Sequence, residues 1–416
     1  MISPGRIISH RNTPMNKLTL AFSMFVLSTA APAQQNVKPP IANYWMNVET
    51  AAGMSIPGMS GVGGMMAGGM GGSRMQSGKK MHLQLGSQRD ANPARADHFI
   101  PQGMAMGASL PLTGERSSVP RAGERGDRPE HMERPKGRML IYWGCGASAR
   151  PGQPVIIDFA RLSAGQAPAM ASRRVATGTP PSTSSRGYGE WPNPTDSKPV
   201  PASSSLAGSH AIKGNYTPDI QFSLSDDFMD RVELAASQQG AATRVQWNSV
   251  PTATGYFATV MNPQGDDVVF WSSSEVQELG STLMDYIPPV EVARLIRERV
   301  VLAPQTTECV VPAEVSKGGG GFLQFIAYGP EANFAHPPRP ADTRQPWNPE
   351  WAVKVRFKST AGTMLGADDG GTRANRPGRD TGTTPSEDRA ATQPQQPSTP
   401  DPVKEGINIL KGLFGR

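Results

Sequence analysis

The chain has 416 residues, with 41 lysines and arginines against 35 aspartates and glutamates. Residues 1–33 hold three of the basic residues and no acidic ones, so the remainder has 38 basic against 35 acidic residues, an excess of +3. So small an excess gives no reason to expect nucleic acid or an anionic membrane as a partner. The 45 glycines and 40 prolines make up about a fifth of the chain, against a usual share of about 12%. Much of the chain is therefore expected to lie outside regular helices and strands.

The first segment, residues 1–33, has the pattern of a cleavable export signal. Lys17 precedes an apolar run from Leu18 to Val26, and Ala31-Pro32-Ala33 supplies the small residues of a cleavage site. The run is shorter than the roughly 20 apolar residues that a retained spanning helix needs. We expect translation to start at Met15 and the mature protein to be periplasmic or secreted.

Residues 34–162 are predicted to form an N-terminal β-rich unit. Its strands are indicated by alternating apolar and polar residues between Gly and Pro clusters. Within it, residues 51–78 are rich in Gly and Met and are predicted to be a loop. The predicted strands of this unit are 41–50, 80–85, 98–100, 108–112, 138–143 and 154–159.

Residues 163–209 contain mostly Ser, Pro, Thr and Gly, and are predicted to be a disordered linker because they offer little apolar surface to bury. A second β-rich unit is predicted over 210–360. Helical spacing of Val292, Leu295 and Ile296 predicts one internal helix at 289–301. The predicted strands are 220–224, 232–234, 244–247, 255–261, 268–272, 283–287, 308–311, 322–328 and 351–358.

The C-terminal part is predicted to be a second disordered linker, 361–400, followed by a helix over 401–416. Val403, Ile407, Leu410 and Phe414 fall on one face of that helix, and three basic residues lie on it as well. Docking on a protein surface is one expectation for such a helix. Weak contact with a membrane surface is the other.

Within the second unit, the segment Val245–Met261, VQWNSVPTATGYFATVM, resembles the second and third strands of fibronectin type III domains. Trp247 and Tyr256 are expected to be inward aromatic anchors on neighbouring antiparallel strands, joined by a turn at 251–255. The following DDVVFWSSS continues as a further strand. The resemblance covers about 220–330, departs from the family at the helix, and implies a binding or spacer module without catalysis.

Together these patterns predict a mainly β fold of two β-sandwich-like units with long loops, one internal helix and a C-terminal amphipathic helix. Cys145 and Cys309 are the only cysteines. In an exported protein they can form one long-range disulfide, and two buried free thiols are the alternative.

Nine of the 20 methionines lie between Met54 and Met106. Thioether sulfur favours Cu(I), so an exported Met-rich loop is a candidate metal site. An adaptable apolar loop is the plainer interpretation. The candidate ligands are Met65, Met66, Met70, Met75, Met81 and His82.

The other motifs in the sequence say less about function. Gly144–Ala149 fits the loose dinucleotide fingerprint, but Pro151 and Pro154 break the helix that the motif requires, so a turn carrying a cysteine is expected. The histidines after residue 33 lie mostly among Pro and Gly and are expected in solvated loops. No sequence motif of a hydrolase or metalloprotease occurs.

The sequence therefore predicts an exported non-enzymatic binding or envelope-structural protein without a cofactor, whose partner is an envelope protein. A periplasmic Cu(I)-handling protein and an exported hydrolase with a site assembled from distant residues are the two alternatives.

Overall fold

The computed structural model describes residues 35–55, 77–114, 137–163, 173–280, 282–319, 321–342 and 344–366. The chain divides into two compact units, one made of residues 1–37 and 340–347 and the other of residues 38–339 and 348–416. In the small unit, Val37 forms a parallel bridge with Trp347, whose backbone N–H donates to the carbonyl of Asn36 at 2.9 Å.

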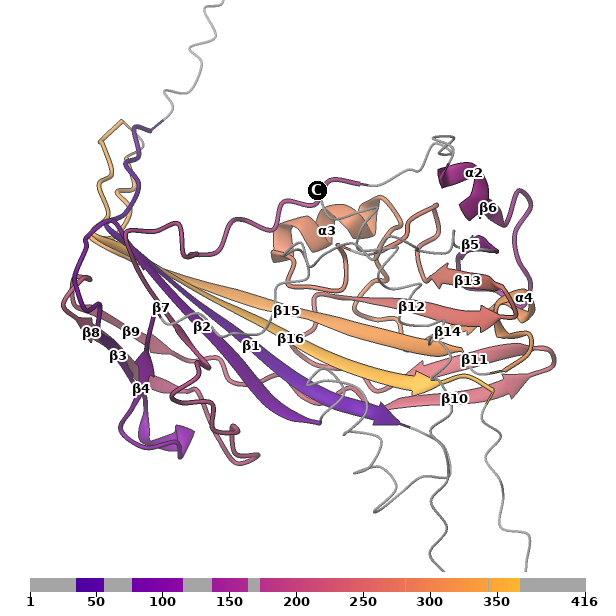
Figure 1. The fold of residues 1–416 in the computed structure, drawn as a ribbon, viewed down its shortest axis with the longest axis horizontal. Coiled ribbons are helices and arrows are strands. Elements are labelled where there is room, and N and C mark those ends of the chain that lie inside the picture. The colour runs from indigo at the N-terminus through magenta and orange to yellow at the C-terminus, as the bar shows by residue number, and fades with distance from the viewer. Residues whose placement is uncertain are drawn as a thin grey trace, which may run out of the picture. The chain divides into compact units, whose positions relative to one another are not determined.

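The large unit is built on one nine-stranded sheet, in the order β6-β5-β13-β12-β15-β16-β1-β2-β7 (Figure 1). Neighbours are antiparallel except for two parallel pairs, β1 with β16 and β5 with β13. Its strands are β1 (Ala42–Ser55), β2 (Gly78–Ser87), β5 (Arg138–Trp143), β6 (Val155–Asp158), β7 (Gly187–Trp191), β12 (Gly255–Gln264), β13 (Asp267–Ser272), β15 (Phe322–His336) and β16 (Trp351–Met364).

Two smaller sheets cover one face of the large sheet. The four-stranded sheet has the order β4-β3-β8-β9 and the three-stranded sheet the order β10-β11-β14. Their side chains join those of the large sheet in one hydrophobic core. These strands are β3 (Ala96–Phe99), β4 (Ser109–Leu112), β8 (Gly208–Gly214), β9 (Ile220–Leu224), β10 (Leu234–Gln239), β11 (Ala242–Trp247) and β14 (Glu308–Val311).

The opposite face of the large sheet carries the helix α3 (Pro289–Arg297). Val292 and Leu295 of this helix pack on Phe257 and Ile326, which point away from the two small sheets. The remaining helical segments are short: η1 (Gln102–Met104), α2 (Phe159–Ser163) and α4 (Ala313–Ser316).

The mainly β class is confirmed, but the two predicted units are not separate. Strands from 34–162 and from 210–360 lie in one continuous sheet, and β1 pairs with β16 over most of its length. Two separate small sheets cover the core face of the large sheet, and each of them packs on one half of that face.

The predicted linker 163–209 is wrong over its described part. Residues 187–191 form β7, which pairs with β2 and buries Trp191 at 2% exposure. Its alternation was hidden because two of its inward positions are glycines. A Cβ at Gly187 or Gly189 would lie within 3 Å of Tyr216, so these positions have room only for glycine.

Several predicted boundaries also shift. β1 continues to Ser55, so the first residues of the predicted loop 51–78 are strand, and β16 continues to Met364 into the predicted tail linker. Residues 283–287 form no strand, although Leu283 and Ile287 are buried against α3. The strand expected at 232–234 is replaced by β10, and the helix predicted to reach residue 301 ends at Arg297.

The predicted signal (1–33), most of the Met-rich loop (56–76) and the predicted terminal helix (401–416) lie outside the described residues. Among the residues that are described, none belongs to a helix long and apolar enough to cross a bilayer.

Candidate functional site

The face of the large sheet that carries α3 also carries a ladder of cations and aromatic rings. Arg356 on β16 is only 8% exposed, and its guanidinium carbon lies 4.5 Å from the ring centroid of Trp45 and 4.7 Å from that of Tyr286. Its Nε donates to Asn47 Oδ1 at 2.8 Å. Burial lowers the pKa of Arg356, and nearby Asp285 opposes this shift. Two rings and one amide thus hold a nearly buried cation.

The neighbouring lysines of β16 extend the ladder. Lys358 Nζ lies 4.3 Å from the Tyr286 ring, 3.7 Å from Glu49 and 3.4 Å from Asp285. Lys354 pairs with Glu331 and lies 5.7 Å from the Trp45 ring. Because carboxylates accompany the cations, this polar face is close to charge balance and stabilises the sheet rather than offering a strongly charged patch.

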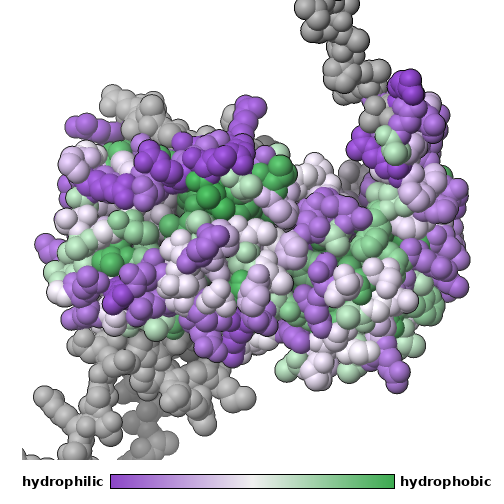
Figure 2. Space-filling view, turned by 180° about the vertical axis from the view of Figure 1, so that it is seen from behind, coloured by the Kyte–Doolittle hydropathy of each residue, from purple (hydrophilic) through white to green (hydrophobic). Residues whose placement is uncertain are grey.

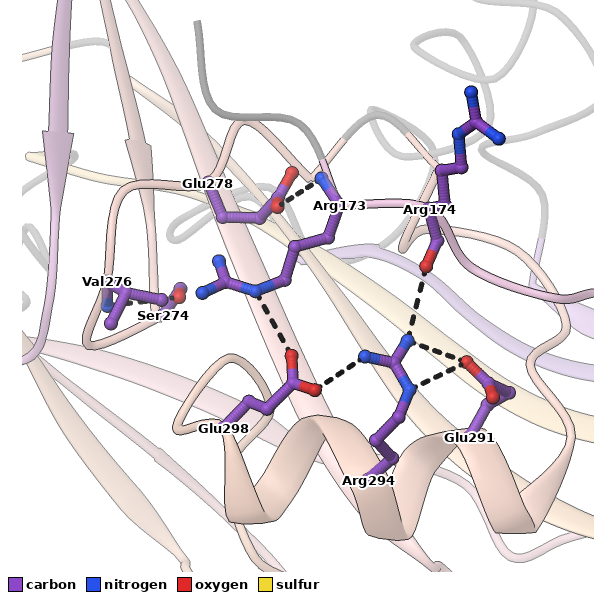
Figure 3. A network of polar contacts seen from close by, with 8 residues as sticks. All are labelled: Arg173, Arg174, Ser274, Val276, Glu278, Glu291, Arg294 and Glu298. Atoms are coloured by element: carbon purple, nitrogen blue, oxygen red, sulfur yellow. Dashed lines mark hydrogen bonds and ion pairs between the residues drawn. The ribbon is translucent and has the colours of Figure 1, made fainter.

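A segment that we call the strap, residues 173–186, crosses this polar face from α3 to β7 (Figure 1). Its first residues are tied to the helix by the network in Figure 3. Arg173 Nε donates to Glu298 at 3.1 Å, and Arg294 donates to Glu298 and Glu291 at 2.7 Å and to the carbonyl of Arg174 at 3.2 Å. Arg294 lowers the pKa of both carboxyls.

The rest of the strap lies directly on β1 and β2. Gln84 donates to the carbonyl of Pro181 at 3.2 Å. A Cβ at Gly178 would meet the Trp45 ring at 3.0 Å, and one at Gly86 would meet Ser185 at 2.6 Å. Glycine at both positions therefore allows the close approach of strap and sheet.

Beside the end of the strap lies an open polar hollow of about 380 Å³. Arg186, which is exposed, lines it. The other lining side chains that can hydrogen-bond are Asn43, Ser87, Gln88, Ser184 and Ser185. This hollow is the candidate contact site of the polar face, because it combines concavity with hydrogen-bonding groups.

The two cysteines form a disulfide, with Cα atoms 5.3 Å apart and a sequence separation of 164. Cys145 lies in the turn after β5, the second strand of the large sheet, and Cys309 lies in β14 of the three-stranded sheet. The disulfide therefore links the large sheet covalently to the three-stranded sheet. The same turn is held by a hydrogen bond from the Gly146 N–H to the Val310 carbonyl at 2.8 Å. No helix follows Gly144–Ala149 before β6, in agreement with the predicted turn.

Trp247 and Tyr256 are both inward and buried, as expected, but they do not lie on neighbouring strands. Trp247 is on β11 of the three-stranded sheet and Tyr256 on β12 of the large sheet. Their rings meet edge to face across the layers at 5.6 Å, and Phe325 lies 4.7 Å from Trp247. The turn 251–255 thus connects two sheets.

Of the candidate copper ligands, Met65, Met66, Met70 and Met75 lie outside the described residues. Met81 and His82 are adjacent on β2, so their side chains point to opposite faces. Met81 is buried in the core, whereas His82 lies 3.5 Å from Glu190. These two residues cannot share one ion in this geometry. The described part of the chain holds no cluster of three or more His, Cys, Asp and Glu residues suited to a metal ion.

The expectation that the histidines lie in solvated loops is wrong for His98 and His210. They are 1% and 2% exposed and lie between the four-stranded sheet and β1. Tyr44 Oη is 2.9 Å from His98 Nδ1, and His98 Nε2 is 2.9 Å from His210 Nδ1. His210 Nε2 is 2.8 Å from the Leu206 carbonyl. We call these three side chains the histidine relay.

The relay was missed because each member looked ordinary alone. The alternation of 41–50 already places Tyr44 on the buried face of its strand. His98 and His210 lie on predicted or overlooked strands, and a count of inward positions would have placed both of them inside. That they meet is a consequence of the pairing of β3 with β8, which no local pattern contains.

The described surface offers few large exposed apolar side chains. Phe99, Ile156 and Val290 are 42%, 48% and 73% exposed and lie on different elements. Figure 2 shows, on the face seen from behind, small hydrophobic patches scattered among polar side chains.

No protein-family model matches this chain, and no curated protein matches it at a significant level.

Proposed function

We propose that this chain is an exported, non-enzymatic binding or envelope-structural protein, of which one half is a fibronectin type III-like sandwich. The observation that carries the proposal is the arrangement of seven consecutive strands, stapled by a disulfide. β10 and β11 lie in the three-stranded sheet, and the chain then crosses to β12 and β13 in the large sheet. It returns to the three-stranded sheet with β14 and crosses again to the large sheet with β15 and β16. Two sheets with crossing connections of this kind are the architecture of such modules.

The disulfide supports export, because such bonds persist in oxidising compartments. The predicted signal before Gln34 points the same way. An envelope protein is the proposed partner, and the hollow beside Arg186 is its proposed contact site. Weak contact of residues 401–416 with a membrane surface belongs to the same proposal.

Export is tested by mass analysis of the protein from the native host. The expected product starts near Gln34, is recovered outside the cytoplasm, and incorporates no alkylating reagent before reduction. A cytoplasmic chain with an intact N-terminus and two reactive thiols would contradict the proposal.

The binding role is tested with a photoreactive residue in place of Arg186, and with the same residue at the exposed position Gln239 of β10 as a matched control. We expect one adduct of defined mass from position 186 in intact cells, absent from position 239 and competed by excess purified mature chain. A chain that stays uncrosslinked and turns over ester, peptide or glycoside substrates would favour the hydrolase alternative.

A further inference from the structure

The protonation of the histidine relay follows from its geometry. The Leu206 carbonyl can only accept, so His210 Nε2 carries a proton. A neutral imidazole has one N–H, so His210 Nδ1 accepts from His98 Nε2, and His98 Nδ1 in turn accepts from the Tyr44 hydroxyl. With both rings neutral, every hydrogen-bonding atom of the relay has a partner.

An added proton breaks this order. Protonated His210 would present an N–H to the His98 N–H, and His98 could accept it only by moving its own proton to Nδ1. The Tyr44 hydroxyl would then lose its acceptor, and a cation would lie among buried rings. Phe222 stacks on His210 at 4.9 Å and on the other side contacts Phe334 at 5.2 Å.

The surroundings offer little compensation for that charge, and the main one is the hydrogen bond of His210 to the Leu206 carbonyl. Burial lowers the pKa of His98 well below its usual value and also lowers that of His210, and no carboxylate acts appreciably on either ring. The Asp227 carboxylate near Leu206 is bound by the Leu206 N–H and by Ser205. The charged residues of the two strands, Asp97 and Lys213, alternate with the inward histidines and point outward. From the large sheet, Tyr44 is the titratable group bonded to His98, and Tyr216 acts in turn on Tyr44.

We propose that Tyr44, His98 and His210 form an acid-sensitive latch that holds the four-stranded sheet on the large sheet and opens when the surroundings become acidic. The relay joins β1 of one sheet to β3 and β8 of the other, so its loss acts on the contact between the layers. Between about pH 6.5 and the lower native pKa, the open form binds protons that the closed form does not, and closure weakens as the pH falls.

The latch is tested by amide hydrogen exchange of the mature, oxidised chain at pH 7.5 and pH 5.0, corrected for intrinsic exchange rates. With an open-state pKa of about 6.5, each histidine favours opening on the order of thirtyfold at pH 5. For the two histidines together the increase is on the order of a thousandfold, and we expect exchange in β3 and β8 to rise by up to that factor, with β11 and β14 as the internal reference. Unchanged relative protection of β3 and β8 would overturn the proposal.

Two variants locate the effect. Replacing both rings, His98→Gln with His210→Gln, keeps donors and acceptors without titration and should abolish the pH-dependent increase. The control His336→Gln removes an exposed histidine and should leave the increase intact. An increase that survives the double replacement would overturn the proposal.

Nitrogen NMR of the wild-type chain keeps the test independent of how the variants fold. We expect two histidines that are neutral with the proton on Nε2 at pH 7, and whose pKa values both lie below the usual imidazole value of about 6.5. Titration of both near pH 6.5, or a proton on Nδ1 of either, would contradict the latch. None of these outcomes depends on whether the proposed export and binding role is correct.

Discussion

The two small sheets lie on the same large sheet but are joined to it by different chemistry. The three-stranded sheet is held by a covalent bridge, Cys145–Cys309, and by the aromatic contacts of Trp247. The four-stranded sheet is held by the histidine relay and by stacked rings around Phe222. The first half should therefore respond to reduction and not to mild acid, and the second half should respond to acid and not to reduction.

The largest effect is expected from removing the disulfide. Replacing Cys145 and Cys309 by Ala removes the bridge that closes a loop with a sequence separation of 164, which on the chain-entropy model costs about 5 kcal/mol of unfolding free energy. Urea denaturation followed by tryptophan fluorescence measures the loss. Hydrogen exchange should rise first in β11 and β14, while β3 and β8 keep their protection.

Reduced wild-type protein is the matched control for that pair of substitutions, because it opens the bridge without changing any side-chain carbon. It should lose a similar amount of stability. If reduction costs less than about 1 kcal/mol, or if it loosens β3 and β8 as much as β11 and β14, the two halves are not held separately.

A smaller effect is expected at Arg356, because β16 and its neighbour β1 lie in the middle of the large sheet, which carries both small sheets. Arg356→Ala removes a nearly buried cation from between Trp45 and Tyr286 and leaves the Asn47 carbonyl without its donor. We expect a loss of about 2 to 3 kcal/mol. Exchange should increase in the small sheets of both halves.

Arg344→Ala is the control for Arg356→Ala. Its side chain is 81% exposed, so the substitution should change the unfolding free energy by less than about 0.5 kcal/mol. If Arg356→Ala changed the unfolding free energy as little as Arg344→Ala, the cations and rings of the polar face would not stabilise the protein.

A single-atom change distinguishes the relay half. Tyr44→Phe keeps the buried ring but leaves His98 Nδ1 without a donor, which should cost about 1 to 2 kcal/mol at pH 7. Chemical denaturation at fixed pH measures it. The loss should add to that of the disulfide variant, since the sites belong to different layers.

Tyr286→Phe is a matched substitution outside the relay, since the Tyr286 ring contacts Arg356 and Lys358 through its face. It should leave the protection of β3 and β8 unchanged. Equal loss of protection in both variants would assign the effect of Tyr44→Phe to the sheet as a whole.

The two halves differ in how much of their structure could be predicted from the sequence. Around Trp247 and Tyr256 the local pattern already gave the inward aromatic anchors, and only their assignment to neighbouring antiparallel strands was wrong, because they lie in different sheets. In the other half, β7 was taken for linker because glycines occupy inward positions against Tyr216. His98 and His210 were misplaced because their environment depends on strands more than 100 positions apart. Short-range alternation predicts which side chains point inward, but not which ones meet.

The smallest effect is expected from the strap, which lies outside both small sheets. Arg294→Ala removes the donor shared by Glu291 and Glu298 and one bond to the strap backbone at Arg174. Exposed ion pairs contribute little to global stability, so the unfolding midpoint should barely move. Exchange at 174–180 should nevertheless rise severalfold, because this end of the strap loses its anchor on α3.

The pH dependence of the strap separates its anchor from the latch. Arg294 lowers the pKa of Glu291 and Glu298, so their contribution is present above the usual carboxyl pKa of about 4.3 and disappears as the pH falls through the lower native value. Wild-type strap exchange should therefore approach that of Arg294→Ala only below about pH 4, whereas β3 and β8 should loosen already near pH 5. Simultaneous loosening of strap and four-stranded sheet in wild type would mean that one acid transition controls both faces of the large sheet.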